Sequence, residues 1–393
     1  MFSRKRIFSI FIAFILFVIV LEINSLTGVN EINKIDDRLR NVFHFNEGRA
    51  ASMNESYHHI RGVELKNKQN KGIVRPKYTS DEFQQGMNVL IYGHPDMAEA
   101  HRVFQHLRKL GVNSVAINFP LYQTDWQGND VQMNPTITPT IPELTELIER
   151  AHAVGLSVML RPLLDESNLM IANKWRGQIK PNDPNAWFNS YQSLLLTYAE
   201  LAQTTDVKVL NIGTEFNSLQ QLYQNKWIEM INALRQIYDG ELMYSFNWDT
   251  VQDIPSIKFV QFLDHVGIDA YFPLNVPDGA DLETLETAWN KRINKLKKFL
   301  DHDSIIITEA GIIPVSGAYR TPYKWNIPNG KLDWQAQANY YEATYKAWNA
   351  SIQGFYWWNV TLDQNQEEIS YSPLNSPTEN VIKKYFLDKP LNE

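Results

Sequence analysis

Two glutamates, Glu215 and Glu309, stand at the ends of short strand-like stretches that finish Asn211-Ile212-Gly213-Thr214 and Ile305-Ile306-Ile307-Thr308. A carboxylate at the end of a buried strand is costly to desolvate unless it has partners or a chemical task. Taken singly, each glutamate also fits a salt bridge or a helix cap. Two such carboxylates facing each other suit glycoside cleavage, because one donates a proton to the leaving oxygen while the other attacks the anomeric carbon. A gap of about 5 Å permits direct attack, whereas about 6.5–9.5 Å admits a water and inverts the configuration.

Both glutamates belong to a rhythm of short apolar runs that alternate with longer helical patterns from Gly86 onward. This alternation is typical of βα units and a parallel sheet. Eight strands are expected, at Met87–Tyr92, Ser114–Phe119, Ser157–Pro162, Val207–Ile212, Leu242–Asn247, Val266–Tyr271, Ser304–Thr308 and Gly354–Trp358. The pattern predicts an α/β chain with a (β/α)₈ TIM barrel over residues 86–393, whose active site lies at the carboxyl ends of the strands. A doubly wound open sheet is the alternative, but no glycine-rich phosphate loop follows the first strand.

Amphipathic helices are expected between the strands. Two of them should end at glycines, because Gly111 follows the first helix and Gly155 the second. The expected helices are Met97–Leu110, Ile141–Val154, Trp187–Gln203, Lys226–Tyr238, Leu282–Leu300 and Gln335–Asn349.

The N-terminus differs from the rest of the chain. Basic residues 4–6 precede an apolar run over residues 7–21, which predicts a signal anchor at residues 1–28 with the body exported. The expected location is the cell membrane, crossed by a single span, with an extracellular catalytic domain; secretion after signal cleavage is the alternative. Residues 29–85 are polar and are interpreted as a stalk and an N-terminal extension, with one short strand at residues 60–65.

Composition excludes several kinds of site. The sequence has no cysteine, so disulfides, thiolate metal sites and cysteine nucleophiles are ruled out. The net charge of −7 argues against nucleic acid as a partner. The histidines do not form a metal set, because His101 and His106 are five residues apart on one helix, and no Gly-x-Ser-x-Gly elbow is present. Neither a metal nor an organic cofactor is expected, and a monomer is expected.

Several stretches resemble glycoside hydrolase family 113, a clan A family whose characterised members are mainly endo-β-1,4-mannanases. The resemblance runs from about residue 86 to 358. One position departs from the clan, since Thr214 stands where clan A enzymes usually carry Asn. The stretches that carry the resemblance are Trp175-Arg176-Gly177, Trp187-Phe188-Asn189-Ser190-Tyr191, Gly213-Thr214-Glu215, Gly267-Ile268-Asp269-Ala270-Tyr271 and Thr308-Glu309-Ala310-Gly311.

The resemblance implies roles for particular residues. Glu215 would be the general acid/base, Glu309 the nucleophile, and Tyr271 the tyrosine that hydrogen-bonds the nucleophile. Trp358 would form the sugar platform of the −1 subsite, with Trp357 as the alternative. Neighbouring strand residues point to opposite faces, so only one of these tryptophans can line the mouth.

Further sugar contacts are expected at the ends of other strands. The candidates for direct contact with sugar are Asn247, Trp248 and Arg161. The candidates for the wall of the cleft are Tyr122, Gln123 and Trp175. The expected function is a retaining glycoside hydrolase that cleaves β-1,4-linked polysaccharide, most simply an endo-β-1,4-mannanase. A non-catalytic surface glycan-binding protein and a glycosidase that trims the cell's own exported polysaccharide are the alternatives. The sugar, the linkage and endo or exo action are left open.

Overall fold

The computed structural model describes residues 83–393, apart from residues 301, 303, 363–368 and 388–393. The expected membrane anchor at 1–28, the strand at 60–65 and all of the expected stalk up to residue 82 lie outside the described residues. Within the described part of the chain, none of the helices combines the length and the apolar composition that crossing a membrane requires.

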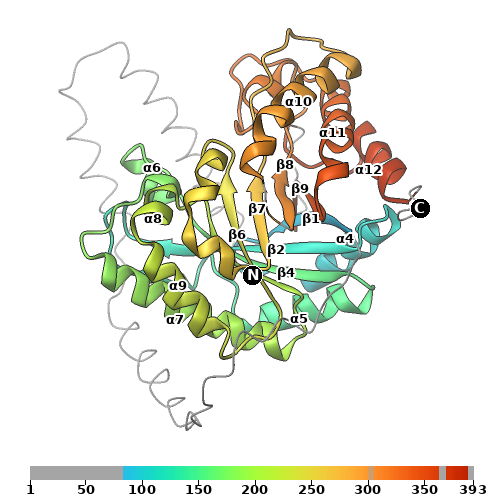
Figure 1. Cartoon of the computed structure of the whole chain (residues 1–393). Helices are drawn as coiled ribbons and strands as arrows, with labels where there is room; N and C mark the ends of the chain where they lie inside the picture. The colour runs from blue at the N-terminus through green and yellow to red at the C-terminus, as the bar shows by residue number, and fades with distance from the viewer. Residues whose placement is uncertain (1–82, 301, 303, 363–368, 388–393) are drawn as a thin grey trace, which may run out of the picture. The chain divides into compact units, whose positions relative to one another are not determined.

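Eight parallel strands close into a barrel (Figure 1). Each strand pairs with the next along the chain, and the last pairs with the first, which confirms the predicted barrel and rejects the open sheet. The strands are β1 (Gln84–Leu90), β2 (Ser114–Gln123), β4 (Ser157–Leu164), β5 (Val209–Thr214), β6 (Glu241–Asn247), β7 (His265–Asp269), β8 (Ile305–Ala310) and β9 (Gly354–Thr361). β2 runs past its expected end because Pro120 and Leu121 still pair with β4 and its last two residues pair antiparallel with β3 (Val131–Gln132).

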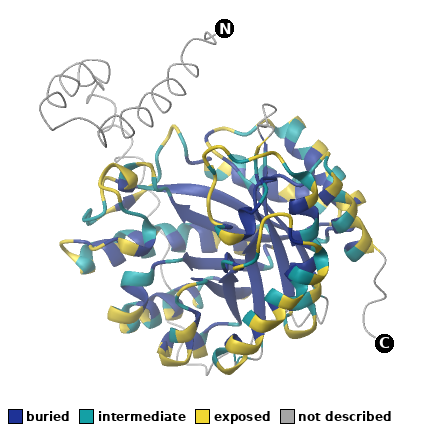
Figure 2. Cartoon of the chain, turned by 90° about the horizontal axis from the view of Figure 1, so that it is seen from above, coloured by how far each residue is buried: buried dark blue, intermediate teal, exposed yellow. Residues whose placement is uncertain are grey.

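Helices surround the barrel with their buried faces toward the strands (Figure 2). The larger ones are α4 (Met97–Lys109), α5 (Ile141–Ala153), α7 (Pro184–Thr204), α9 (Gln224–Leu234), α10 (Leu282–Leu296), α11 (Trp334–Trp348) and α12 (Pro377–Leu387). The shorter ones are α6 (Ser167–Ile171), α8 (Asn217–Leu222), η2 (Arg176–Gln178), η3 (Val251–Ser256), η4 (Lys258–Phe262), η5 (Lys297–Phe299), η6 (Ala318–Arg320) and η7 (Asn349–Ser351). The helices expected from sequence periodicity did not include α12. The connection after β6 holds η3 and η4.

Side-chain caps fix where the helices begin. Asp96 accepts hydrogen bonds from the first turn of α4, and Thr140 and Glu143 form a reciprocal capping box on α5. The predicted glycine stops are confirmed: Gly111 and Gly155 follow α4 and α5 with φ of 89° and 79°.

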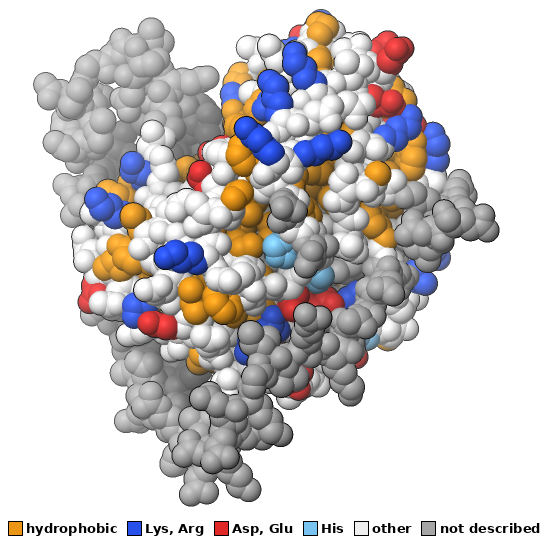
Figure 3. Space-filling model, viewed as in Figure 1, with side chains coloured by type: hydrophobic (Ala, Val, Ile, Leu, Met, Phe, Trp, Pro, Cys, Tyr) orange, Lys and Arg blue, Asp and Glu red, His pale blue; other side chains and the backbone are white. Residues whose placement is uncertain are grey.

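Basic side chains gather over α10 (Figure 3). The carboxyl half of α10 and the following η5 turn hold Lys291, Arg292, Lys295, Lys297 and Lys298. Cations near the carboxyl end of a helix interact favourably with its dipole, so the charge run suits this position.

The barrel interior is layered, because inward-facing residues recur every second position along a strand. The floor is an apolar plug of Ala116, Met159, Val209, Met243, Ile306 and Tyr356. Two positions further along the same strands stand Asn118, Arg161, Asn211, Ser245, Thr308 and Trp358, all buried. Apolar residues therefore close the barrel below, and the layer above them is polar except for Trp358.

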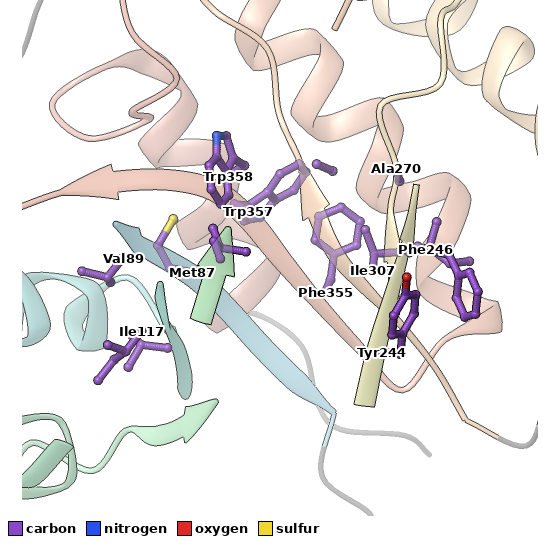
Figure 4. Close-up of a cluster of buried hydrophobic side chains, with 14 of the residues drawn as sticks. Met87, Val89, Ile117, Tyr244, Phe246, Ala270, Ile307, Phe355, Trp357 and Trp358 are labelled. Atoms are coloured by element: carbon purple, nitrogen blue, oxygen red, sulfur yellow. The ribbon is translucent and has the colours of Figure 1, made fainter. Parts of the chain in front are cut away.

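The opposite faces of the strands pack against the helices. Figure 4 shows part of this outer layer, where Phe355 of β9 and its strand neighbour Ile307 of β8 lie side by side. Gly86 of β1 faces the interior instead. A Cβ atom there would lie 2.2 Å from the ring of Tyr356, so only glycine leaves room for the plug.

Candidate active site

A cavity of about 420 Å³ opens at the carboxyl ends of the strands. Its walls come from strand ends and from the loops after β4, β6, β8 and β9. The residues that line it are Glu166, Trp175, Arg176, Glu215, Asn247, Trp248, Asp249, Tyr271, Glu309, Tyr323, Trp325, Trp358 and Tyr371. Both glutamates singled out in the sequence therefore line one cavity.

Local irregularities in β5 and β8 aim the two glutamates. Along β8 the register skips Thr308, since Ile268 pairs with Ile307 but Asp269 pairs with Glu309. Such a bulge re-aims a side chain at the mouth of a barrel. β5 carries a similar shift against β6 just before Glu215, whose φ of 56° lies in the strained left-handed region.

Glu309 is held at both carboxylate oxygens. Nη1 of Arg161 donates to Oε1 at 2.5 Å, and the Tyr271 hydroxyl donates to Oε2 at 2.7 Å. Burial and the charge of Glu309 raise the pKa of Tyr271 well above its usual value, so its hydroxyl stays protonated as a donor. The Glu309 carboxylate thus has one neutral and one charged donor in fixed positions.

Arg161 corrects one expectation. It was predicted to contact sugar, but it is fully buried in the polar layer below the cavity. Its Nη2 donates to both carboxylate oxygens of Asp269 at 2.9 and 3.0 Å, and Asp269 also accepts from Thr308 at 2.8 Å. Burial opposes the charge of Arg161, but Asp269 and Glu309 together raise its pKa. Arg161 therefore anchors the Glu309 carboxylate from beneath.

Glu215 has different surroundings. Nδ2 of Asn247 donates to its Oε1 at 2.7 Å, whereas the nearest cation, Nε of Arg176, stands 3.9 Å from its Oε2. Burial raises the pKa of Glu215 well above its usual value, and the charges of Asp269 and Glu309 add to this rise while Arg176 opposes it. Burial and the neighbouring carboxylates therefore favour the protonated form of Glu215.

Seven aromatic residues line the cavity. Tyr271, Trp175, Trp248 and Trp358 were expected from the sequence, whereas Tyr323, Trp325 and Tyr371 were missed. The missed residues lie in the loops after β8 and β9, outside any periodic pattern. The available signal was the cluster Tyr323-Lys324-Trp325 in a proline- and glycine-containing loop, because exposed aromatic residues in loops often mark binding surfaces.

The rings form two groups within the cavity. The Trp325 ring meets Trp358 edge-on at 6.3 Å and Tyr371 at 4.8 Å. Trp248 and Tyr323 stack with ring centroids 6.0 Å apart and planes within 6° of parallel. Flat apolar faces of this kind suit the C–H faces of pyranose rings.

Three other expected sugar contacts lie elsewhere. Trp357 points away from the cavity and stacks on Tyr341 of α11 at 3.9 Å, so Trp358 is the tryptophan of this pair that lines the mouth. Gln123 is buried and accepts a hydrogen bond from Trp187 at 2.8 Å, while Tyr122 pairs with β3. Neither lines the cavity, because the end of β2 is taken up by its antiparallel partner.

Among the described residues, no group of three or more histidine, aspartate or glutamate side chains is arranged to hold a metal ion. The arrangement that the cavity does offer is a pair of carboxyl groups, one whose pKa is raised by burial and one held by two donors.

The model of Glycoside Hydrolase Family 113 matches residues 91–372. Among solved structures, the β-mannanase of this family from Alicyclobacillus acidocaldarius, in complex with ManMIm, is 23% identical with a TM-score of 0.67, over 78% of this chain and 97% of that one. A complex of a family 113 β-1,4-mannanase gives 23% identity and a TM-score of 0.68, over 78% of this chain and all of that one (100%). The β-glucuronidase from Ruminococcus gnavus is 12% identical with a TM-score of 0.51, over 78% of this chain and 50% of that one. No curated protein matched the sequence.

The solved structures share the barrel fold with this chain, and the family match covers well over half of its length. The catalytic domain is that of a glycoside hydrolase, and the chain belongs to glycoside hydrolase family 113.

Proposed function

We propose that the chain is a retaining β-1,4-mannanase in which Glu215 is the acid/base and Glu309 the nucleophile. The observation that carries this proposal is that the two carboxyl groups line one cavity in opposite surroundings. Glu215 is largely enclosed beside other carboxylates with its pKa raised, whereas Glu309 accepts from Arg161 and Tyr271. Two carboxyl groups with divergent environments are the requirement for acid and nucleophile in glycoside cleavage.

In the first step the Glu215 carboxyl donates its proton to the glycosidic oxygen, while a carboxylate oxygen of Glu309 attacks the anomeric carbon. The bond between that carbon and the glycosidic oxygen breaks, and its electron pair stays on the leaving oxygen. A covalent glycosyl–enzyme ester remains. Arg161 and Tyr271 keep the carboxylate in place, so that little reorganisation is needed for the attack.

In the second step Glu215, now a carboxylate, takes a proton from water as the water oxygen attacks the anomeric carbon. The ester bond to Glu309 breaks, and its electron pair returns to the carboxylate. Two successive displacements restore the starting β configuration. Both steps use only groups that line the cavity or support it.

A mannan substrate follows from the family and the named activities of the two similar structures, together with the aromatic walls of the cavity. Trp358 would lie beneath the sugar that is attacked, and the Trp248–Tyr323 stack would contact a neighbouring sugar. Two separate groups of rings in one cavity favour a chain-like substrate over a single sugar.

The direct test is the release of reducing ends from mannan, glucomannan, cellulose, xylan and galactan by the full-length chain. Mannan and glucomannan are expected to be cleaved. Glu215→Gln should lose about 10²–10⁴-fold in kcat because the proton donor is gone, and Glu309→Ala should form no glycosyl–enzyme. Wild-type protein that binds glycan but cleaves none would favour a non-catalytic glycan-binding protein instead.

We also propose that residues 1–28 tether the enzyme to the membrane with the barrel outside the cell. There the enzyme would cleave external polysaccharide or trim the cell's own exported polysaccharide. The support is the basic flank at residues 4–6 before the apolar run at 7–21. Protease added to intact cells should degrade the barrel, and a barrel that is protected until the cells are lysed would contradict this location.

A further inference from the structure

Arg176 and Glu166 form a second charged group beside the acid/base glutamate. Both follow β4, and neither has a role in the two displacement steps. Oε1 of Glu166 accepts from the Arg176 Nε at 2.8 Å and from the Arg176 backbone N–H at 3.0 Å. The same Nε stands 3.9 Å from Oε2 of Glu215. One guanidinium charge is therefore shared unequally between two carboxyl groups.

We propose that Glu166 and Arg176 are positioning residues for Glu215, in which Glu166 fixes the guanidinium and the guanidinium limits how tightly Glu215 retains its proton. This inference rests on the proposed role of Glu215 as acid/base. Neither residue needs to touch the substrate for this role.

Two contacts hold the loop around Arg176 in place. A Cβ atom at Gly177 would lie 2.3 Å from the Trp175 ring, so glycine lets that ring pack onto the backbone. The Ser218 hydroxyl of α8 donates to the Ile179 carbonyl oxygen at 2.5 Å. Because α8 begins directly after Glu215 and Phe216, this bond ties the loop of Arg176 to the segment that carries Glu215.

The electrostatic need for such a residue follows from the surroundings of Glu215. Burial and the charges of Asp269 and Glu309 raise its pKa, and a carboxyl group that retained its proton too tightly would be a weak proton donor and would still be protonated when a base is needed. A positive charge within about 4–6 Å favours the carboxylate and opposes that rise. The 3.9 Å gap makes Arg176 a charge neighbour of Glu215 and not a hydrogen-bond donor to it.

Other ionisable groups also act on Glu215, and they remain the same in every variant below. In the described part of the chain, those that face it or line the same cavity are Arg161 on β4, Tyr244 on β6, Asp249 after β6, Asp269 on β7, Tyr271 after β7, Glu309 on β8, and Tyr323 and Tyr371 in the loops after β8 and β9.

The test is the pH dependence of kcat/KM on a manno-oligosaccharide for Arg176→Gln and Glu166→Gln. Arg176→Gln removes the positive charge and so raises the pKa of Glu215. The acid form of Glu215 then persists to higher pH, and the basic limb of the profile of kcat/KM against pH should move up by about one pH unit. Removing the negative charge of Glu166 frees the guanidinium to act on Glu215, so the basic limb should move down. Arg176→Lys, which keeps the charge, should return the limb toward the wild-type position.

Opposite shifts separate an electrostatic role from a structural one, because damage to the fold would lower activity without moving the limbs in opposite directions. Glu146→Gln, which removes an exposed partner of Arg150 on α5, is the matched control and should leave the profile unchanged. Shifts in the same direction, or no shift in active variants, would overturn the inference while leaving the proposed function intact.

Carbon-13 NMR titration of the Glu215 carboxyl carbon measures the same pKa shifts without turnover. Its signal is assigned by its loss in Glu215→Gln. Wild-type protein inactive on every glycan would contradict the proposed function alone.

Discussion

At the scale of single residues, the two glutamates differ through their neighbours. Glu309 accepts from a charged and a neutral donor, whereas Glu215 has one amide donor and a more distant cation. Position in the barrel brings both to the same cavity, and their different neighbours are the basis of the separate roles proposed for them. Arg161 is fully buried and contacts the carboxylates of Asp269 and Glu309 at once.

Tyr271→Phe tests the support of Glu309 by a single hydroxyl. The variant loses the 2.7 Å hydrogen bond to Oε2 and should lower kcat/KM about 10- to 100-fold, the usual worth of a hydrogen bond to a charged group. The matched control is Tyr238→Phe, whose buried hydroxyl donates to the Val207 carbonyl oxygen, and it should keep full kcat/KM. Unchanged kcat/KM in Tyr271→Phe would contradict a supporting role for this hydroxyl.

The sequence predicted the cavity-lining residues at strand ends correctly. It did not predict which strand residues lie below the cavity inside the barrel. Glu215, Glu309 and Tyr271 stand at or just after strand ends, and the structure has all three in the cavity. Arg161 lies in β4 with Leu163 and Leu164 still to follow, so it faces the layer below. The two-residue period predicted that only one of Trp357 and Trp358 faces the cavity, but the register of β9, which chooses between them, depends on pairing with β1 and β8.

At the scale of elements, the ends of the barrel strands supply the two glutamates and the loops supply most of the cavity walls. Strand and helix periodicity predicted the eight strands and most helices, because burial on one face imposes the pattern. The connection from β8 to α11 has no such period, so Tyr323 and Trp325 could not be assigned to the cavity in advance. Two loops therefore meet across the cleft in the Trp248–Tyr323 stack without any sequence signal that pairs them.

Tyr323→Ala tests this wall. Removing the exposed ring should raise KM for mannohexaose about threefold to tenfold and leave kcat unchanged, because the contact binds ground state and transition state equally. Tyr323→Phe keeps the ring and should retain the wild-type KM. Steady-state kinetics on mannohexaose would decide, and a fall in kcat at constant KM would mean that Tyr323 acts in the chemical step.

At the scale of the whole molecule, closure of the barrel brings the first and last parts of the catalytic domain together. β9 pairs with β1, and α12 packs on α11 near the end of α4. A Cβ atom at Gly111 would lie 2.7 Å from the backbone of Phe386, so α12 sits directly against the turn after α4. The site depends on this closure, since Trp358 and Glu309 belong to the last two strands.

Phe386→Ala tests the contribution of α12 to the closed barrel. The ring is buried, and its loss should lower the free energy of unfolding by about 3–5 kcal/mol, as for other buried phenylalanines. Urea denaturation measures the change. The neighbouring Leu387→Ala, at a half-exposed position, should stay within about 0.5 kcal/mol of wild type. Equal effects in the two variants would mean that α12 does not stabilise the barrel through this contact.

The most direct measurement for the division of roles is azide rescue of the two glutamate variants on an activated aryl β-mannoside. In Glu309→Ala, azide takes the place of the missing nucleophile and the product should be the α-mannosyl azide. In Glu215→Ala, the glycosyl–enzyme still forms and azide opens it, so the product should be the β-mannosyl azide. Proton NMR of the products reads the anomer. Opposite anomers from the two variants are the predicted result, and the same anomer from both, or the reverse assignment, would contradict the roles given to Glu215 and Glu309.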